Sequence, residues 1–164
     1  MNSERIRRQF GSFGIDVLES SAARRVSSLY SLEQGDRICR TYAVVEFNSD
    51  AVAALAEEHA LVTAGHSIGA VFKAGGWAVD KRHTRIGSVT LTSDHNTITA
   101  LMRLEPPQQV AVQSYVFAAS RGGPAFEYAA ITELHHPRYL TEADVQAICG
   151  EPEPFLYPGQ ATGG

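Results

Sequence analysis

Apolar and polar residues alternate along much of the chain in the way that strands of an antiparallel sheet require. Stretches rich in β-branched and aromatic residues, bounded by turn-forming residues, predict strands. These stretches are residues 13–19, 25–32, 37–47, 77–79, 85–92, 109–119 and 125–134. Apolar residues at helical spacing predict helices over residues 3–10, 48–64, 93–104 and 141–149, while residues 67–73 fit a short strand or a helical turn.

Turn residues join four of these strands into two hairpins. Glu-Gln-Gly-Asp at residues 33–36 joins strand 25–32 to strand 37–47. Arg-Gly-Gly-Pro at residues 121–124 joins the last two predicted strands, because Gly permits positive φ and Pro fixes φ near its turn value. Strands in hairpins, with helices inserted between the pairs, predict an α+β fold with a mostly antiparallel sheet.

Composition limits the chain to a few broad classes. With 164 residues, 44% of them hydrophobic, we expect one domain over residues 1–150 and a flexible tail, rich in Pro and Gly, over residues 151–164. A net charge of −4 with no basic run argues against nucleic acid or an anionic membrane surface as a partner. No stretch has the length of a transmembrane helix, and Cys39 and Cys149 lack CxxC spacing. We therefore expect a cytoplasmic protein without a disulfide scaffold or a zinc site.

Glu133 is the first candidate functional residue. Alternation places it with Ile131 on one face of strand 125–134, and places Tyr128 and Thr132 on the other. Both faces carry apolar residues, so we expect a central strand that is covered on both sides. A carboxylate in such a place must be paired, hydrogen-bonded or used in a site. The alternative is a strand-end Glu that reaches solvent or pairs with an Arg.

Arg40, between Ile38 and Tyr42 in a predicted strand, is the best cationic candidate to accompany Glu133. Its alternative is an edge-strand Arg in water. The adjacent pair His135-His136 does not predict a metal site, because neighbours on a strand point to opposite faces and metal sites need convergent ligands. The sequence also contains no GxSxG nucleophile elbow, no cysteine-nucleophile signature and no phosphate-loop spacing of glycines.

Four segments, taken in order, resemble the chorismate lyase family and the related ligand-binding domain of bacterial transcription regulators. They are ERIRRQFGSFGIDVLES, RRVSSLYSLEQGDRICRTYAVVEF, HSIGAVF and GGPAFEYAAITELHHP. The Thr132-Glu133-Leu134 match in the last segment is the most specific. The resemblance implies a chorismate lyase-like fold: a six-stranded antiparallel sheet with a small-molecule cavity beneath flaps that carry helices. It also implies the conversion of chorismate to 4-hydroxybenzoate and pyruvate, which needs no metal and no cofactor.

The resemblance carries three positions onto this chain. Glu133 matches the family's active-site glutamate, and Gly69 matches the glycine whose backbone amide contacts the product carboxylate. Tyr42 stands where the family has its active-site arginine. Arg40 lies two residues away, hence on the same face of the strand, and a small shift of alignment would place it in the site.

Chorismate is a dianion, so a lyase must offer cations or amides to two carboxylates. We expect Arg40 to hold one carboxylate and Lys73 or Arg25 to hold the second, while Glu133 donates a proton or a hydrogen bond to an oxygen of the substrate.

The family's enzymes have a further N-terminal helical segment ahead of the first strand, which this sequence lacks. We therefore expect a homodimer that covers the open side. Two other functions remain open. One is a non-catalytic module that binds a small organic or aromatic acid in the same cavity, and the other is an interaction domain with a filled interior and an exposed apolar patch.

Overall fold

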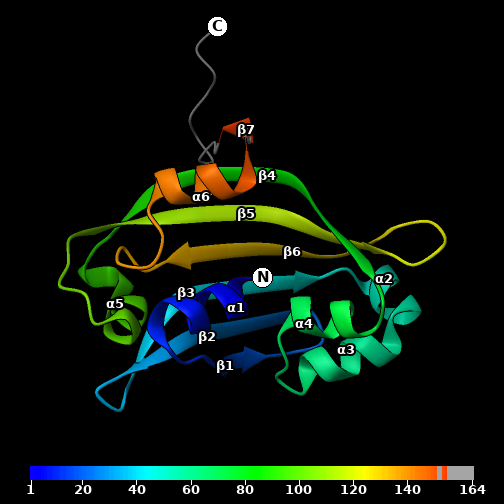
Figure 1. Ribbon diagram of the computed structural model, residues 1–164, viewed down its shortest axis with the longest axis horizontal. Coiled ribbons are helices and arrows are strands. Elements are labelled where there is room, and N and C mark those ends of the chain that lie inside the picture. The colour runs from blue at the N-terminus through cyan, green and yellow to red at the C-terminus, as the bar shows by residue number, and fades with distance from the viewer. Residues whose placement is uncertain (151–152, 155–164) are drawn as a thin grey trace, which may run out of the picture.

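The computed structural model describes residues 1–150 and 153–154 (Figure 1). The elements follow one another in the order α1 (Asn2–Phe10), β1 (Gly14–Ser20), β2 (Arg24–Glu33), β3 (Asp36–Phe47), α2 (Ser49–Ala54), α3 (Ala56–Thr63), α4 (Ile68–Ala74), β4 (Ala78–Leu91), a 3-10 turn η1 (Ser93–His95), α5 (Asn96–Met102), β5 (Gln108–Ser120), β6 (Phe126–His135), α6 (Glu142–Cys149) and β7 (Glu153–Pro154).

Six antiparallel strands form one sheet in the order β1-β2-β3-β6-β5-β4. β2 and β3 form the first predicted hairpin, and β5 and β6 form the second. Gly35 and Gly122 have φ values of 84° and 69° in these turns, which is the backbone conformation that glycine adopts most readily. The α+β class and the mostly antiparallel sheet are confirmed. β7 pairs with β4 in parallel at the edge.

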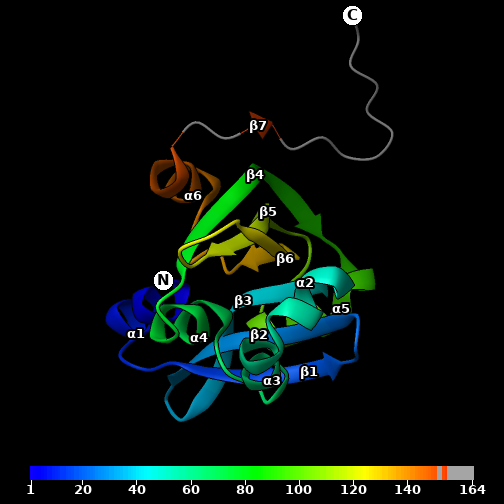
Figure 2. The ribbon, with the colours of Figure 1, turned by 90° about the vertical axis from the view of Figure 1, so that its right-hand side faces the viewer.

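Helices α1, α3, α4 and α6 cover one face of the sheet, which we call the covered face (Figures 1 and 2). Two clusters of buried side chains fill the space between these helices and the sheet. One joins α1 and α6 to the sheet and contains Ile6, Leu29, Ala43, Ile86, Ala111, Tyr139, Leu140 and Val145. The other joins α3 and α4 to it and includes Val45, Val62, Phe72, Phe117, Tyr128 and Ile131. The gap between the two clusters is the candidate site.

A β-bulge in β6 changes which side chains face the core. Phe117 pairs with Ala129 and Ala118 pairs with Glu127, so Tyr128 is an extra residue on its strand. Tyr128 and Ile131 therefore lie in the same core cluster, whereas simple alternation places them on opposite faces. β6 is central, as predicted, but it is not covered on both sides. Ala130 is exposed on the other face.

The helical predictions hold with the following differences. The helix predicted over residues 93–104 is the 3-10 turn η1 followed by α5. The helix predicted over residues 48–64 breaks at Leu55 into α2 and α3, with Leu55 at φ −118°. Residues 67–73 form most of α4, so the ambiguous segment is helical. Thr141 and Asp144 make the capping box that their spacing predicts, and Val145 is buried, but Ile148 is 48% exposed and does not point inward.

The two short strands predicted at 77–79 and 85–92 are one strand, β4, with an irregularity between Arg82 and Arg85. His83 there has a φ of 53°. Of the predicted tail, residues 151–164, all but Glu153 and Pro154 lie outside the described residues. No helix in the described part of the chain combines the length and the apolar character needed to cross a membrane.

Candidate functional site

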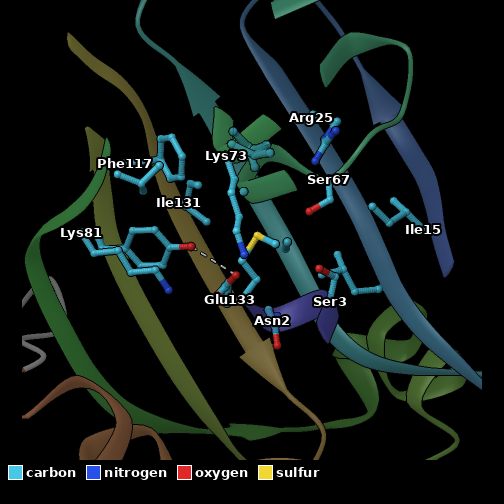
Figure 3. A pocket seen from close by; sticks show the side chains of 18 of the residues that line it. Asn2, Ser3, Ile15, Arg25, Ser67, Lys73, Lys81, Phe117, Ile131 and Glu133 are labelled. Atoms are coloured by element: carbon cyan, nitrogen blue, oxygen red, sulfur yellow. Dashed lines mark hydrogen bonds between the residues drawn. The ribbon is translucent and has the colours of Figure 1, made fainter. Parts of the chain in front are cut away.

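A cavity of about 330 Å³ lies between the covered face of the sheet and helices α1 and α4 (Figure 3). The sheet supplies an apolar floor made of Leu29, Ala43, Val45, Tyr115, Phe117 and Ile131. The polar and charged side chains that also line it are Asn2, Ser3, Arg25, Ser67, Lys73, Lys81 and Glu133. An apolar cavity with a few polar groups is the usual form of a small-molecule site.

Strand register explains why these side chains meet. Arg25 pairs with Val45, and Val45 pairs with Ile131, so one row of inward-facing residues crosses β2, β3 and β6. Glu133 lies in the next row, opposite Ala43. Arg25 and Glu133 are therefore two strands and two residues apart, roughly 12 Å at the backbone for ordinary strand spacing. They stand on opposite sides of the apolar floor.

Glu133 is only 7% exposed, so the solvent-facing alternative is excluded. The Tyr115 hydroxyl donates a hydrogen bond to Glu133 Oε1 at 3.3 Å. Burial, together with the negative charge of Glu133, raises the pKa of Tyr115 well above its ordinary value. Tyr115 thus keeps its proton and acts as a donor to the carboxyl group. On the other side, His135 Nε2 lies 3.8 Å from Glu133 Oε2.

Arg25 provides a buried guanidinium on the opposite side of the cavity, with 3% of the residue exposed. Its Nη1 donates to the carbonyl oxygens of Val62 and His66, at 2.8 and 2.9 Å, which ties β2 to the end of α3. Its Nε is buried and has no hydrogen-bond partner in the described part of the protein. Burial lowers the pKa of Arg25 from its ordinary value. Arg25 lines the cavity, but Nε itself is inaccessible in this structure, so an acceptor on a ligand reaches it only after a shift of the side chain.

Two lysines stand at the outer part of the cavity. Lys73 of α4 is exposed and lies 3.7 Å from a carboxylate oxygen of Glu4. Lys81 of β4 is also exposed and places its Nζ 4.5 Å from the centre of the Tyr115 ring. Both are mobile cations on long stems and can reach a ligand that enters beside them.

Gly69 lines the cavity from α4, as the sequence predicts. A Cβ atom added there would lie 3.0 Å from Sδ of Met1. The absence of a side chain at this position therefore lets the start of α1 lie close against α4. These two helices together cover the cavity on the side opposite the sheet (Figure 3).

Arg40 does not line this cavity, which corrects the expectation that it faces Glu133. A second bulge makes Arg40 the extra residue between Cys39 and Thr41, and only 1% of it is exposed. Its guanidinium instead donates to Ser31 and Glu33 and lies 3.8 Å over the Phe10 ring.

Tyr42 also lies outside the cavity. It pairs with Leu134, which belongs to the opposite face of the sheet from Ala43 and Glu133. Arg40 and Tyr42 therefore cannot replace each other in the site, because neither side chain lines the cavity and the bulge at Arg40 breaks the alternation between them.

Of the six residues predicted for the site, four line one cavity: Glu133, Gly69, Lys73 and Arg25. Sequence reasoning missed Tyr115 and His135. Both could have been found from the sequence. Tyr115 lies in the strand that was expected to pair with β6. His135 is two residues from Glu133 and thus on the same face of β6.

The described residues contain no group of three or more His, Cys, Asp or Glu side chains that could hold a metal ion. No known protein-family model matches the chain, and no curated protein matches it significantly.

Proposed function

We propose that the cavity binds a small cyclic carboxylic acid, and that the protein converts chorismate to 4-hydroxybenzoate and pyruvate. One observation carries this proposal: a buried guanidinium with an unpartnered N–H and a buried carboxyl group stand on opposite sides of one apolar cavity. The chorismate lyase resemblance in the sequence supports the choice of substrate.

Arg25 would bind the ring carboxylate of the substrate. Its Nε–H has no partner in the described part of the protein and would pair with the ligand after a shift of the side chain, and a hydrogen bond between two charged groups in a buried site is stronger than one between neutral groups. Lys73 and Lys81 at the outer part of the cavity would meet the second carboxylate, that of the enolpyruvyl group. Arg25 would thus bind the carboxylate that the sequence analysis assigned to Arg40.

The ring would lie on the apolar floor formed by Val45, Phe117 and Ile131. The cavity of about 330 Å³ is at the lower end of the range of small-molecule sites, which suits a ligand with one substituted six-membered ring. Binding of the ring there would exclude water from the reacting carbon atoms, which strengthens the electrostatic interactions around them.

Glu133 would act on the ring carbon that carries the hydroxyl group. Its carboxylate takes the proton from that carbon, and the electrons of the C–H bond form the new ring double bond. The bond from the adjacent carbon to the enolpyruvyl oxygen breaks, and enolpyruvate leaves with that electron pair. Enolpyruvate then takes up a proton on its methylene carbon and becomes pyruvate. Tyr115, as donor to Oε1, fixes the orientation of the carboxyl group.

A non-catalytic binding module is the second candidate, and the position of Arg40 favours it. The guanidinium that the resemblance expects in the site is paired with Glu33 outside the cavity. The protein would then hold an aromatic acid through Arg25 and Glu133 without turning it over.

An assay with chorismate decides between these candidates. Wild-type protein should release 4-hydroxybenzoate and pyruvate in equal amounts, and Glu133→Gln should abolish the release while the protein stays folded. Glu127→Gln is the matched control, because Glu127 lies on the same strand and is exposed. Absence of turnover together with Glu133-dependent affinity for an aromatic acid would select the binding module. Equal turnover in both variants would refute the assigned site.

A further inference from the structure

From Glu133 a chain of polar groups runs through His135 and Thr41 to Asn2, which itself lines the cavity. His135 is 1% exposed, and its Nδ1 lies 2.9 Å from Thr41 Oγ1. Asn2 Nδ2 donates to the same Thr41 oxygen at 3.1 Å. The Asn2 side-chain oxygen in turn accepts a hydrogen bond from the Tyr139 hydroxyl, which fixes the orientation of the amide.

The Thr41 hydroxyl accepts from Asn2 and either directs its own hydrogen at Nδ1 of His135 or accepts a second hydrogen bond from Nδ1–H, because a hydroxyl oxygen has two lone pairs. We take the first arrangement, which leaves the other ring nitrogen to serve Glu133. Nδ1 is then an acceptor, and a neutral ring must carry its proton on Nε2. The ring is neutral because burial lowers the pKa of His135 to about 4.

The Nε2 atom of His135 lies near the carboxyl group of Glu133. Nε2 is buried, finds no hydrogen-bond partner among the described residues, and lies 3.8 Å from Oε2 of Glu133. Oε2 would have to approach Nε2 by about 0.6 Å to come within hydrogen-bond range. With Tyr115 already donating to Oε1, both oxygens of Glu133 then accept hydrogen bonds from the protein.

We infer that His135 is the positioning residue of Glu133, holding it as a hydrogen-bond acceptor, so that the ligand must present a hydrogen-bond donor to Glu133. Together with Arg25 on the other side of the cavity, this specifies a ring acid that carries a hydroxyl group opposite its carboxylate. The inference rests on the proposed function in one respect, namely that Glu133 faces the ligand. The His135–Glu133 contact itself is a property of the protein without ligand.

Charged groups on three elements face the imidazole. Glu133 on β6 raises the pKa of His135, while Lys81 on β4 and Arg5 on α1 lower it. Burial is the largest effect and acts in the same direction as Lys81 and Arg5, so that the pKa is lowered in spite of Glu133. The Tyr139 ring packs at 5.8 Å from the imidazole centre. His135 therefore acts as a neutral donor at neutral pH.

The first test needs no ligand. Nitrogen-15 NMR of the histidine rings at pH 7 should show His135 as the neutral Nε2–H tautomer. Thr41→Val should weaken this preference, because it removes the donor to Nδ1. Glu133→Gln should shift the titration of His135 to lower pH, because it removes the negative charge that raises its pKa. An Nδ1–H tautomer, or a titration that Glu133→Gln leaves unchanged, would overturn the inference.

The second test compares 4-hydroxybenzoate with benzoate as probes. Wild-type protein should bind 4-hydroxybenzoate about tenfold more tightly, the gain expected from one hydrogen bond to a charged group. His135→Leu should abolish this preference while the affinity for benzoate stays the same, and His135→Gln, which keeps an N–H donor, should restore it. A preference that His135→Leu does not change would contradict the positioning role. If the wild type binds neither probe, the proposed function is wrong, and the NMR result decides the His135–Glu133 contact by itself.

Discussion

Two arginines that are both buried have different surroundings, and these decide their roles. Arg40 donates to Ser31 and Glu33 and stacks on Phe10, outside the cavity. Arg25 donates to backbone carbonyls through Nη1 and lines the cavity. Each of the two guanidinium groups keeps one buried donor without a partner among the described residues, Nε of Arg25 and Nη1 of Arg40, so the difference between them is their place relative to the cavity. The sequence marks Arg40 as the better candidate because it lies in mid-strand, but the bulge that turns it away leaves no mark in the pattern of apolar residues.

Two buried histidines, His135 and His136, make the free energy of unfolding depend on pH. Burial lowers the pKa of both His135 and His136 to about 4, below the ordinary value of 6.5. Burial and the positive charges of Arg40 and Arg138 lower the pKa of His136, while its hydrogen bond with the Met102 carbonyl oxygen, 3.0 Å from Nε2, raises it. The backbone N–H of Arg138 donates to Nδ1 at 3.0 Å, so Nδ1 carries no proton in the folded protein. The unfolded chain therefore binds protons more readily than the folded protein between these two pH values.

We predict that the free energy of unfolding is highest above pH 6.5 and falls as the pH drops toward 4. The loss should be on the order of 3 kcal/mol for each histidine. Urea unfolding at pH 7.5, 5.5 and 4.5 measures it. His136→Gln should reduce the dependence, whereas His83→Asn, a change at an exposed histidine, should retain it. A free energy of unfolding that stays constant between pH 7.5 and 4.5 would show that these side chains are not buried as neutral groups.

At the scale of elements, turn residues and β-branched runs were sufficient to predict both hairpins and their antiparallel pairing. They were insufficient for α4, because its short apolar sequence fits a strand and a helical turn equally well. They were also insufficient for the bulges at Tyr128 and Arg40, because an inserted residue depends on how the partner strand twists. Of the four predicted site residues that line the cavity, Arg25 and Glu133 lie on strands, while Gly69 and Lys73 lie on α4, so alternation along a strand applies only to the first two.

The close approach of α1 and α4 predicts how the cavity can be blocked. Gly69→Leu adds a side chain at the cavity wall where a Cβ already meets Met1. We expect at least tenfold weaker binding of 4-hydroxybenzoate in a protein that still folds, because the gain in helix propensity offsets part of the cost of displacing the Met1 side chain. Ala70→Leu adds similar bulk at an exposed position of the same helix and should leave the affinity unchanged. Equal affinities in the two variants, measured by calorimetric titration, would place the ligand elsewhere.

At the scale of the whole molecule, one chain closes its own cavity. Helices α1, α3, α4 and α6 lie over the covered face, so this face does not require a second subunit (Figure 2). The homodimer stays a prediction, and its original reason, an open face, is weaker now that this arrangement is known. Val17, Leu18 and Leu61 are exposed apolar residues, and a contact between two subunits could bury them.

The central claim is that this cavity binds a ring carboxylic acid through Arg25 and Glu133. Calorimetric titration of 4-hydroxybenzoate into the wild type and into Arg25→Lys tests it most directly. Lysine keeps the positive charge but lacks the Nε donor, so the wild type should bind one equivalent and the variant should bind at least tenfold more weakly. Arg24→Lys, at the exposed neighbouring position, should match the wild type. No saturable binding to the wild type, or equal affinity in Arg25→Lys, would contradict the account.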